Sequence, residues 1–439
     1  MTHSQSNSQS MSRAAVMNFL NEVASRFPRA TSFASGRPAQ QFFQFREMLA
    51  GTEAFVQHFA SGRGLPLEAA WPLLAQYGPT NGIINDLVTK QLANDHGIDC
   101  PAQRILITGG CQEALSLLVQ VLCREATDVI LVRSPCYVGM TGAADIHQVE
   151  LAAFHCDNLS SPVQAIAASA REVAKQGKKA RLLYLVPDFD NPTGAVLTRR
   201  DREQIIEYCA ANEIIVLEDN PYGMFRYEGA DVPSMFSLDP HGCVIFLGTY
   251  SKTLCPSLRI GFAALPPQLF GRPGTGLTLL EKLSQAKSFV TVNTGQLAQA
   301  VVGSVLLAQD CSLRQRIAGA VALYRNNRDH MVRSLARYLG MHASVSWSVP
   351  EGGFFLTVHL PFPFGEHEVN TCAQDYGVLV LPLSFFALDK SQDCSIRLAF
   401  SNVGHDDITR GIERLGAFVA VRLGRRGALD EQTTDRMRK

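Results

Sequence analysis

Short apolar runs alternate with stretches of helical periodicity through the N-terminal and central parts of the chain. The runs that read as strands are bounded by glycine or polar residues and lie at 104–107, 128–132, 182–186, 214–217, 243–247 and 259–265. Helical stretches lie between several of them, at 112–125, 199–212 and 281–309. This alternation predicts an α/β fold: a mostly parallel sheet covered by helices on both faces, with ligands at the carboxyl ends of strands.

The pattern changes near residue 310, which predicts a second, smaller α+β domain. A long helix is expected over 314–339, followed by strands at 354–359, 378–381 and 395–400. The polar N-terminus has no apolar core for a secretory signal and is expected to be frayed. The segments expected from this division are a tail with the start of a helix (1–30), an N-terminal segment packing with the small domain (31–60), a large domain (61–305), a small domain (306–422) and a disordered tail (423–439).

Composition narrows the class of protein. The chain has 439 residues, of which 46% are hydrophobic, so it is long enough for two or three domains with a large core. Forty basic and forty acidic residues give no net charge, which argues against a nucleic-acid partner. No apolar run has the length of a membrane span, and no His, Cys and Asp cluster has metal-ligand spacing. The eleven scattered cysteines predict reduced thiols in the cytoplasm.

One lysine follows directly after a strand-like run. Lys252 lies just past the apolar run 243–247, between Ser251 and Thr253, with Arg259 close behind. Amines that form Schiff bases with carbonyl cofactors need a partly desolvated, electropositive position, because their reactive form is uncharged. The alternative for any single lysine is a solvent-facing charge in a loop.

Other strand ends carry polar residues that a core does not need. Gly109 and Gly110 precede a helix, where free backbone N–H groups suit a phosphate, although a Gly-Gly pair also makes a plain turn. The other polar segments could likewise be either ligand-binding or ordinary turns, since Asn-Pro and Asp-Asn-Pro form turns. They are 134–137, 188–194 and 218–222.

Taken together in their order, these residues form a signature: Tyr137, Asn191, Asp219, Tyr222, Lys252 and Arg259. They resemble the class I/II aminotransferases among fold-type-I pyridoxal-phosphate enzymes, with the aminoadipate, kynurenine, aromatic and valine–pyruvate aminotransferases as the nearest subgroup. The resemblance extends from about residue 32 to residue 421, and Asn-Pro-Thr-Gly followed by Ser-Lys-Thr-Leu-x-Pro-x-Leu-Arg-x-Gly-Phe is highly specific. It implies a seven-stranded, mostly parallel sheet in a large domain that binds pyridoxal 5'-phosphate.

The resemblance also implies roles for individual residues. Lys252 would hold the cofactor as an imine and move the proton at the substrate α-carbon. Asp219 would pair with the pyridine nitrogen, and Tyr137 would stack on the ring. Donors to the ring's phenolic oxygen would be Asn191 and Tyr222. The phosphate would be bound by Gly110, Cys111, Gln112, Thr249, Ser251 and Arg259.

Substrate and subunit contacts follow from the same resemblance. Arg397 would bind the substrate α-carboxylate, beside Asn191. Tyr77 resembles the tyrosine that family members contribute to the partner subunit's phosphate site. The chain is therefore expected to be a homodimer with shared active sites, acting on an amino acid and a 2-oxo acid.

The chain departs from the family near its N-terminus. Relatives usually have Gly-Gly-x-Pro in a segment that closes over the substrate, whereas this chain has Ser35, Gly36, Arg37 and Pro38. Gly36 and Arg37 are therefore candidate substrate contacts, with Arg37 binding an acidic or otherwise polar distal group. The alternative is a solvent-facing arginine at the pocket rim.

Three functions are compatible with the sequence, and transamination is favoured. The second keeps the cofactor but catalyses elimination, replacement, cyclisation or oxidation, which begin with the same imine chemistry. The third is a regulator in which this domain follows a DNA-binding helix-turn-helix. That function requires a basic N-terminal domain and a linker, and the segment before Ser32 is too short to hold them.

Overall fold

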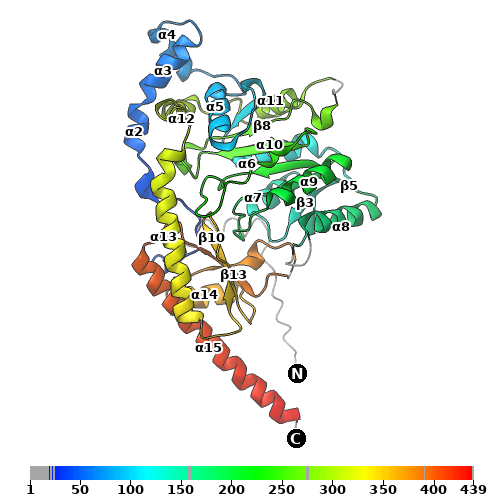
Figure 1. The fold of residues 1–439 in the computed structure, drawn as a ribbon, viewed down its shortest axis with the longest axis vertical. Helices are drawn as coiled ribbons and strands as arrows, with labels where there is room; N and C mark the ends of the chain where they lie inside the picture. The colour runs from blue at the N-terminus through cyan, green and yellow to red at the C-terminus, as the bar shows by residue number, and fades with distance from the viewer. Residues whose placement is uncertain are drawn as a thin grey trace.

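The computed structural model describes residues 19, 22, 25–156, 161–272, 276–389 and 391–437. An α/β layer and a smaller α+β unit lie one above the other, and the long helix α13 runs beside both (Figure 1). Most of the expected N-terminal tail falls outside the described residues. No helix in the described part of the chain is long and apolar enough to cross a membrane.

The central sheet has seven strands in the order β2-β8-β7-β6-β5-β3-β4, which confirms the expected fold class. β8 is antiparallel to both its neighbours, whereas the pairs from β7 to β4 are parallel. The strand bounds are β2 Ile105–Thr108, β3 Asp128–Arg133, β4 Glu150–Phe154, β5 Lys179–Leu185, β6 Ile215–Asp219, β7 Val244–Thr249 and β8 Gly261–Ala264. β4 was not expected from the sequence, because this edge strand is mostly only partly buried and its apolar run is short and includes two alanines, which have low β propensity.

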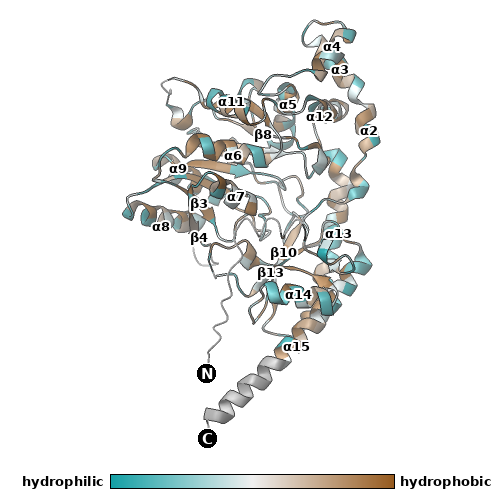
Figure 2. Cartoon of the chain, turned by 180° about the vertical axis from the view of Figure 1, so that it is seen from behind, coloured by the Kyte–Doolittle hydropathy of each residue, from teal (hydrophilic) through white to brown (hydrophobic). Residues whose placement is uncertain are grey.

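Alternating side chains of the central strands pack into two different apolar clusters. Leu182 and Leu217 join the cluster that contains α6, whereas Leu183 and Val216 join the cluster that contains α9. The period-two alternation of a strand therefore requires helices on both faces of the sheet. Figure 2 shows the apolar colour concentrated in these strands and in the helix faces around them. The helices are α5 Asn85–His96, α6 Cys111–Leu122, α7 Val138–Ile146, α8 Pro162–Lys175, α9 Arg199–Ala211 and α10 Met235–Leu238.

The stretch 281–309, expected as one helix, is two helices. α11 (Leu279–Val290) and α12 (Gln296–Ala308) are separated by a non-helical segment in which Val292 has a φ of 63°. The interruption contains β-branched residues, an asparagine and a glycine, all of which have low helix propensity.

The smaller unit is built on α13 (Arg314–Leu339) and a four-stranded sheet in the order β12-β13-β10-β9. Its strands are β9 Ser346–Trp347, β10 Phe355–His359, β12 Leu381–Pro382 and β13 Ser395–Ala399. The expected strand 378–381 is divided into β11 (Val378–Leu379) and β12. Its other helices are α14 Glu366–Asp375 and α15 His405–Met437. α15 continues through most of the segment expected to be a disordered tail, whose sequence contains no proline and several good helix formers.

The N-terminal segment divides between the two units. β1 (Thr31–Ser32) pairs with β11, as expected for a segment that packs with the small domain. The expected range 31–60 was too long, however, because α2 (Phe45–Ala50) and α3 (Thr52–Ser61) pack against α12. α3 buries four apolar side chains there, and α4 (Leu67–Ala75) follows at the top of Figure 1.

Candidate active site

A cavity of about 310 Å³ opens at the carboxyl ends of β5, β6 and β7. The loop 34–37 and Arg397 of β13 close it from the small-domain side. It brings together predicted residues from seven separate segments of the chain: Gly36, Arg37, Cys111, Gln112, Tyr137, Asn191, Asp219, Tyr222, Thr249, Ser251, Lys252, Arg259 and Arg397. Tyr77 does not line this cavity and is 82% exposed.

The side chain of Lys252 lines the cavity. The alternative considered above, a lysine that faces solvent from a loop, is therefore excluded. Lys252 Nζ donates to the carbonyl oxygen of Gly36 at 3.2 Å and lies 5.8 Å from the centre of the Tyr222 ring. Burial, together with the nearby cations Arg397 and Arg259, lowers the pKa of Lys252 to about 8. A substantial fraction of this amine is therefore uncharged at mildly alkaline pH, the form that attacks a carbonyl.

Asp219 is the last residue of β6, and one of its two carboxylate oxygens accepts a hydrogen bond while the other has no hydrogen-bond partner among the described residues. Its Oδ2 accepts a hydrogen bond from the Tyr184 hydroxyl at 2.7 Å, whereas Oδ1 is buried and has no partner among the described residues. Burial raises the pKa of Asp219 to about 6, and hydrogen bonds from Tyr184 and Cys111 oppose that rise. The carboxylate therefore remains mostly ionised at pH 7, and Oδ1 is available to a protonated ring nitrogen.

Backbone, hydroxyl and guanidinium groups converge at the start of α6. Gly110 has a φ of 86° as the N-cap, and a Cβ there would lie 2.4 Å from Nη2 of Arg259. Arg259 donates from Nη1 to Ser251 Oγ at 3.2 Å and from Nη2 to the Gly109 carbonyl oxygen at 3.3 Å. The backbone N–H of Ser251 donates to Thr249 Oγ1 at 3.2 Å. A cation, hydroxyls and a helix N-terminus meeting at one point suit a phosphate group.

Two residues next to this cradle have other partners in the structure. Gln112 donates from Nε2 to the Gly139 carbonyl oxygen at 2.8 Å, so its amide links α6 to α7. The Cys111 thiol lies 3.2 Å from the carbonyl oxygen of Gly248. Burial raises the pKa of Cys111, which therefore remains a thiol and not a thiolate.

Arg397 lies between two aromatic rings. Its guanidinium carbon is 4.3 Å from the ring centre of Phe355 and 4.6 Å from that of Phe386. Nη1 donates to Asn191 Oδ1 at 2.8 Å and Nη2 to the Ala34 carbonyl oxygen, whereas the buried Nε has no partner among the described residues. Burial lowers the pKa of Arg397 to about 10, so it remains a cation at neutral pH.

Arg37 is exposed at the cavity rim, and no side-chain hydrogen bond or ion pair of its guanidinium occurs among the described residues. Its carbonyl oxygen accepts from Ser401 Oγ at 2.7 Å, which fixes the backbone at this point. The preceding residue must be small, because a Cβ on Gly36 would lie 2.2 Å from the Phe355 ring.

The sequence analysis missed Tyr184 and Phe355 as parts of the cavity wall. The signal for Tyr184 was a hydroxyl-bearing residue inside an otherwise aliphatic strand, and a buried phenol requires a partner. Phe355 gave no local signal, because an aromatic residue in a buried strand is ordinary.

The cavity fits pyridoxal phosphate by the chemistry of its donors and acceptors. Gly110 and Arg259 leave space and charge for a phosphate, Lys252 supplies an amine for an aldehyde, and Asp219 Oδ1 requires a donor such as a pyridinium N–H. The phosphate, the aldehyde and the ring nitrogen of the cofactor therefore each have a matching group at this site.

Comparison with known proteins agrees with this chemistry. Residues 62–415 match the family model for aminotransferase class I and II. A (S)-3,5-dihydroxyphenylglycine transaminase of Amycolatopsis orientalis is 36% identical over 93% of this chain and 92% of its own length. An aromatic-amino-acid aminotransferase of Thermococcus litoralis is 30% identical over 77% of this chain and 78% of its own.

The fold is shared with a solved aminotransferase. A kynurenine aminotransferase of Pyrococcus horikoshii, solved with pyridoxamine phosphate and kynurenine, superposes with a TM-score of 0.80 at 26% identity and covers 96% of this chain and 97% of that one. The expected family, cofactor and reaction class are thereby confirmed. The chain belongs to the class I and II aminotransferases, which are pyridoxal-phosphate enzymes of fold type I.

Proposed function

We propose that this aminotransferase acts on L-amino acids with a polar or acidic distal group, and that it does so as a homodimer in the cytoplasm. The observation that supports the transamination chemistry is one cavity in which an amine of lowered pKa, a half-paired carboxylate and an aromatic-flanked arginine face the same space. These groups match the three needs of transamination: a proton carrier, a partner for the cofactor ring and an anchor for the substrate.

The side chains divide the work of the reaction. Pyridoxal phosphate supplies an electron sink for the electrons released at the substrate α-carbon. Lys252 removes the α-proton with its neutral amine and returns it, and Asp219 keeps the ring nitrogen protonated. Arg397 orients the α-carboxylate with its guanidinium donors and so fixes which bond at the α-carbon breaks.

The first test is an absorption experiment on the purified, cofactor-loaded protein with single amino acids. Transamination converts the cofactor to its amine form, and a 2-oxo acid reverses the change. Product formation with no build-up of the amine form would instead favour elimination, replacement or oxidation on the same scaffold.

The proposed substrate class rests on Arg37. Its guanidinium is unpaired among the described residues at the rim of the cavity, next to the loop carbonyl that Lys252 contacts. The relatives named above act on dihydroxyphenylglycine and aromatic amino acids, and a further relative is a 2-aminoadipate transaminase. These substrates carry hydroxyl, aromatic or carboxylate groups at the distal end, which a guanidinium binds well.

An Arg37→Ala variant tests this class. We expect KM for acidic and hydroxylated donors to rise about tenfold, the value of a charge-assisted hydrogen bond, with KM for leucine unchanged. Arg272→Ala is the matched control, since this exposed arginine pairs with Glu213 at the surface. An unchanged preference among donors in Arg37→Ala would refute the role of Arg37 in selection.

Support for the dimer comes from apolar side chains left exposed on one subunit. Tyr77, Phe289 and Leu297 are 82%, 93% and 67% exposed. Large exposed apolar side chains near functional residues are typical of subunit interfaces. Tyr77 is absent from its own subunit's cavity, and we propose that it reaches the phosphate site of the partner.

The proposed compartment rests on the thiols. No disulfide joins any of the eleven cysteines, all of which lie in the described part of the chain, and seven of them have a raised pKa because they are buried. Unpaired cysteines in this number are typical of proteins kept in a reducing compartment.

A further inference from the structure

The carboxylate at the end of β6 is held by the neighbouring strand. Tyr184 of β5 lies opposite Leu217 of β6, two residues before Asp219. Because side chains two apart leave the same face of a sheet, Tyr184 and Asp219 lie on one face, and both are 3% exposed. The pairing of the two strands therefore brings the phenol to the carboxylate.

The hydrogen bond between them leaves one carboxylate oxygen free. The Tyr184 hydroxyl donates to Oδ2 at 2.7 Å, while Oδ1 has no partner among the described residues. The terminal torsion of an aspartate is soft, so an unanchored carboxylate samples a broad range of orientations. Anchoring Oδ2 fixes where Oδ1 points.

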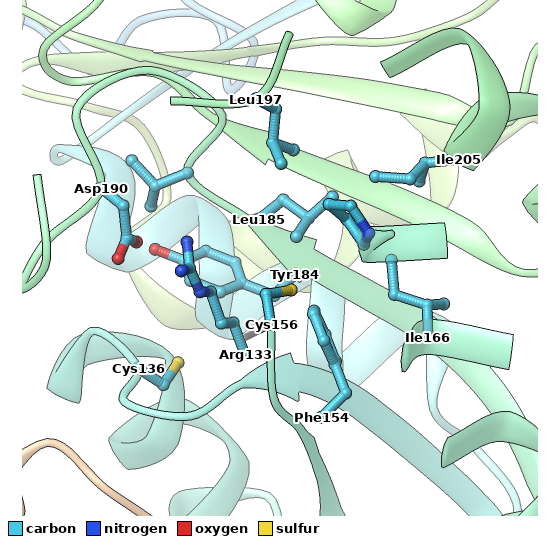
Figure 3. A pocket seen from close by; sticks show the side chains of 12 residues that line it. Arg133, Cys136, Phe154, Cys156, Ile166, Tyr184, Leu185, Asp190, Leu197 and Ile205 are labelled. Atoms are coloured by element: carbon cyan, nitrogen blue, oxygen red, sulfur yellow. The ribbon is translucent and has the colours of Figure 1, made fainter. Parts of the chain in front are cut away.

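The tyrosine itself has little freedom to move. Tyr184 lines the active-site cavity and also a second cavity of about 20 Å³, whose lining Figure 3 shows. The second cavity is lined by side chains that include Arg133, Phe154 and Asp190, and it is only large enough for about one water molecule. Tyr184 is buried, at 3% exposed, and the space beside it is too small for its ring to move far.

We infer that Tyr184 is a positioning residue of this aminotransferase: it aims Oδ1 of Asp219 at the ring nitrogen of pyridoxal phosphate. The inference rests on the proposed contact between Asp219 and that nitrogen. Tyr184 does not make this contact itself and acts on the cofactor through Asp219. Tyr184 also keeps the carboxylate ionised, because its hydrogen bond stabilises the charged form against the effect of burial.

Other groups facing Asp219 do not replace this hydrogen bond. Lys252 is the nearby cation that favours the charged carboxylate, and the Cys111 thiol is a weaker donor than a phenol. Tyr137 and Tyr222 lie near enough for the charge of Asp219 to raise their pKa values, in addition to the effect of burial. Burial raises the pKa of both phenols, so neither carries a charge in the physiological range.

The test compares two cofactors in Tyr184→Phe, with affinity as the readout. One is pyridoxal phosphate and the other is its analogue with C–H in place of the ring nitrogen, which cannot pair with Asp219. We expect the dissociation constant of the natural cofactor to rise about tenfold. The dissociation constant of the analogue should stay within about twofold of the wild-type value.

Tyr227→Phe is the matched control, because Tyr227 is also a buried tyrosine whose hydroxyl donates to a carbonyl oxygen, that of Gly353. It should leave both affinities unchanged. Equal losses for the two cofactors in Tyr184→Phe would indicate a merely structural effect, and no loss for either would equally overturn the inference.

Asp219→Asn separates this inference from the proposed role of Asp219. If Asp219→Asn weakens the natural cofactor but not the analogue, the contact with the ring nitrogen holds, and adding Tyr184→Phe should cause no further loss. A further loss in the double variant would overturn the positioning role. If Asp219→Asn affects both cofactors equally, the contact proposed for Asp219 itself fails.

Discussion

At the scale of single residues, the neighbours of Lys252 determine the pKa of its amine. Burial and the guanidinium groups of Arg397, Arg259 and Arg37 each disfavour its charged form, whereas Asp219 favours it. The sum lowers the pKa of the amine to about 8 from an ordinary value near 10.5. The same arginines that would bind the phosphate and the substrate carboxylate therefore also activate the lysine.

This pKa predicts the pH dependence of cofactor attachment. Because only the neutral amine attacks, the rate of covalent attachment to Lys252 should rise about tenfold per pH unit below pH 8 and level off above it. Stopped-flow absorption after mixing apoprotein with pyridoxal phosphate measures the rate. Lys252→Ala should show no attachment after borohydride reduction and mass spectrometry, and a rate still rising steeply at pH 10 would mean that the pKa is not lowered.

At the scale of elements, α11 supports the loop that begins the phosphate cradle. Glu113 of α6 accepts hydrogen bonds from the Gly109 backbone N–H at 2.5 Å and from Lys287 Nζ at 3.0 Å. Thr291, at the end of α11, donates to the same carboxylate at 2.6 Å. Lys287 is fully buried, so this pair joins two helices and the glycine turn without competition from water.

Lys287→Met should destabilise the protein by about 3–5 kcal/mol, because it leaves the Glu113 carboxylate largely buried and without its cation. Urea unfolding of the apoprotein measures the change in the free energy of unfolding. Lys282→Met on the same helix is the control, since Lys282 is exposed and should cost less than about 0.5 kcal/mol. Similar losses of unfolding free energy in the two variants would contradict the role of Lys287 in joining α11 to α6.

At the scale of the whole molecule, the active site is proposed to need two chains. The cavity holds Lys252 but not Tyr77, and Tyr77 is exposed on the surface of its own subunit. A two-fold dimer would supply each cavity with the tyrosine of the other chain, since such an interface uses the same patch on both subunits.

Complementation between two inactive chains tests this arrangement. Lys252→Ala and Tyr77→Phe, co-expressed with different tags, should form mixed dimers in which one site has both native residues. Purification on both tags keeps only the mixed dimers, which should have about half of the wild-type sites, measured as activity per dimer. A Tyr77→Phe, Lys252→Ala double variant paired with Lys252→Ala should remain inactive. If the first mixture also showed no activity, that result would count against shared sites.

The fold class and most of the cavity residues could be predicted because their signals are local. Lys252, Asp219 and Asn191 stand in short motifs directly after apolar strands, and parallel strands place their carboxyl ends at one edge of the sheet. Arg397 was assigned from the family resemblance, and the structure brings it to Asn191 across 206 positions of sequence.

The tertiary structure decided what depends on contacts between distant segments. Tyr184 approaches Asp219 only because β5 and β6 pair in one register, and no motif marks it. The packing of α2 and α3 on α12 likewise follows from which surfaces remain to be covered. Local sequence determines strand ends and turn chemistry, whereas burial and hydrogen-bond satisfaction are properties of the assembled chain.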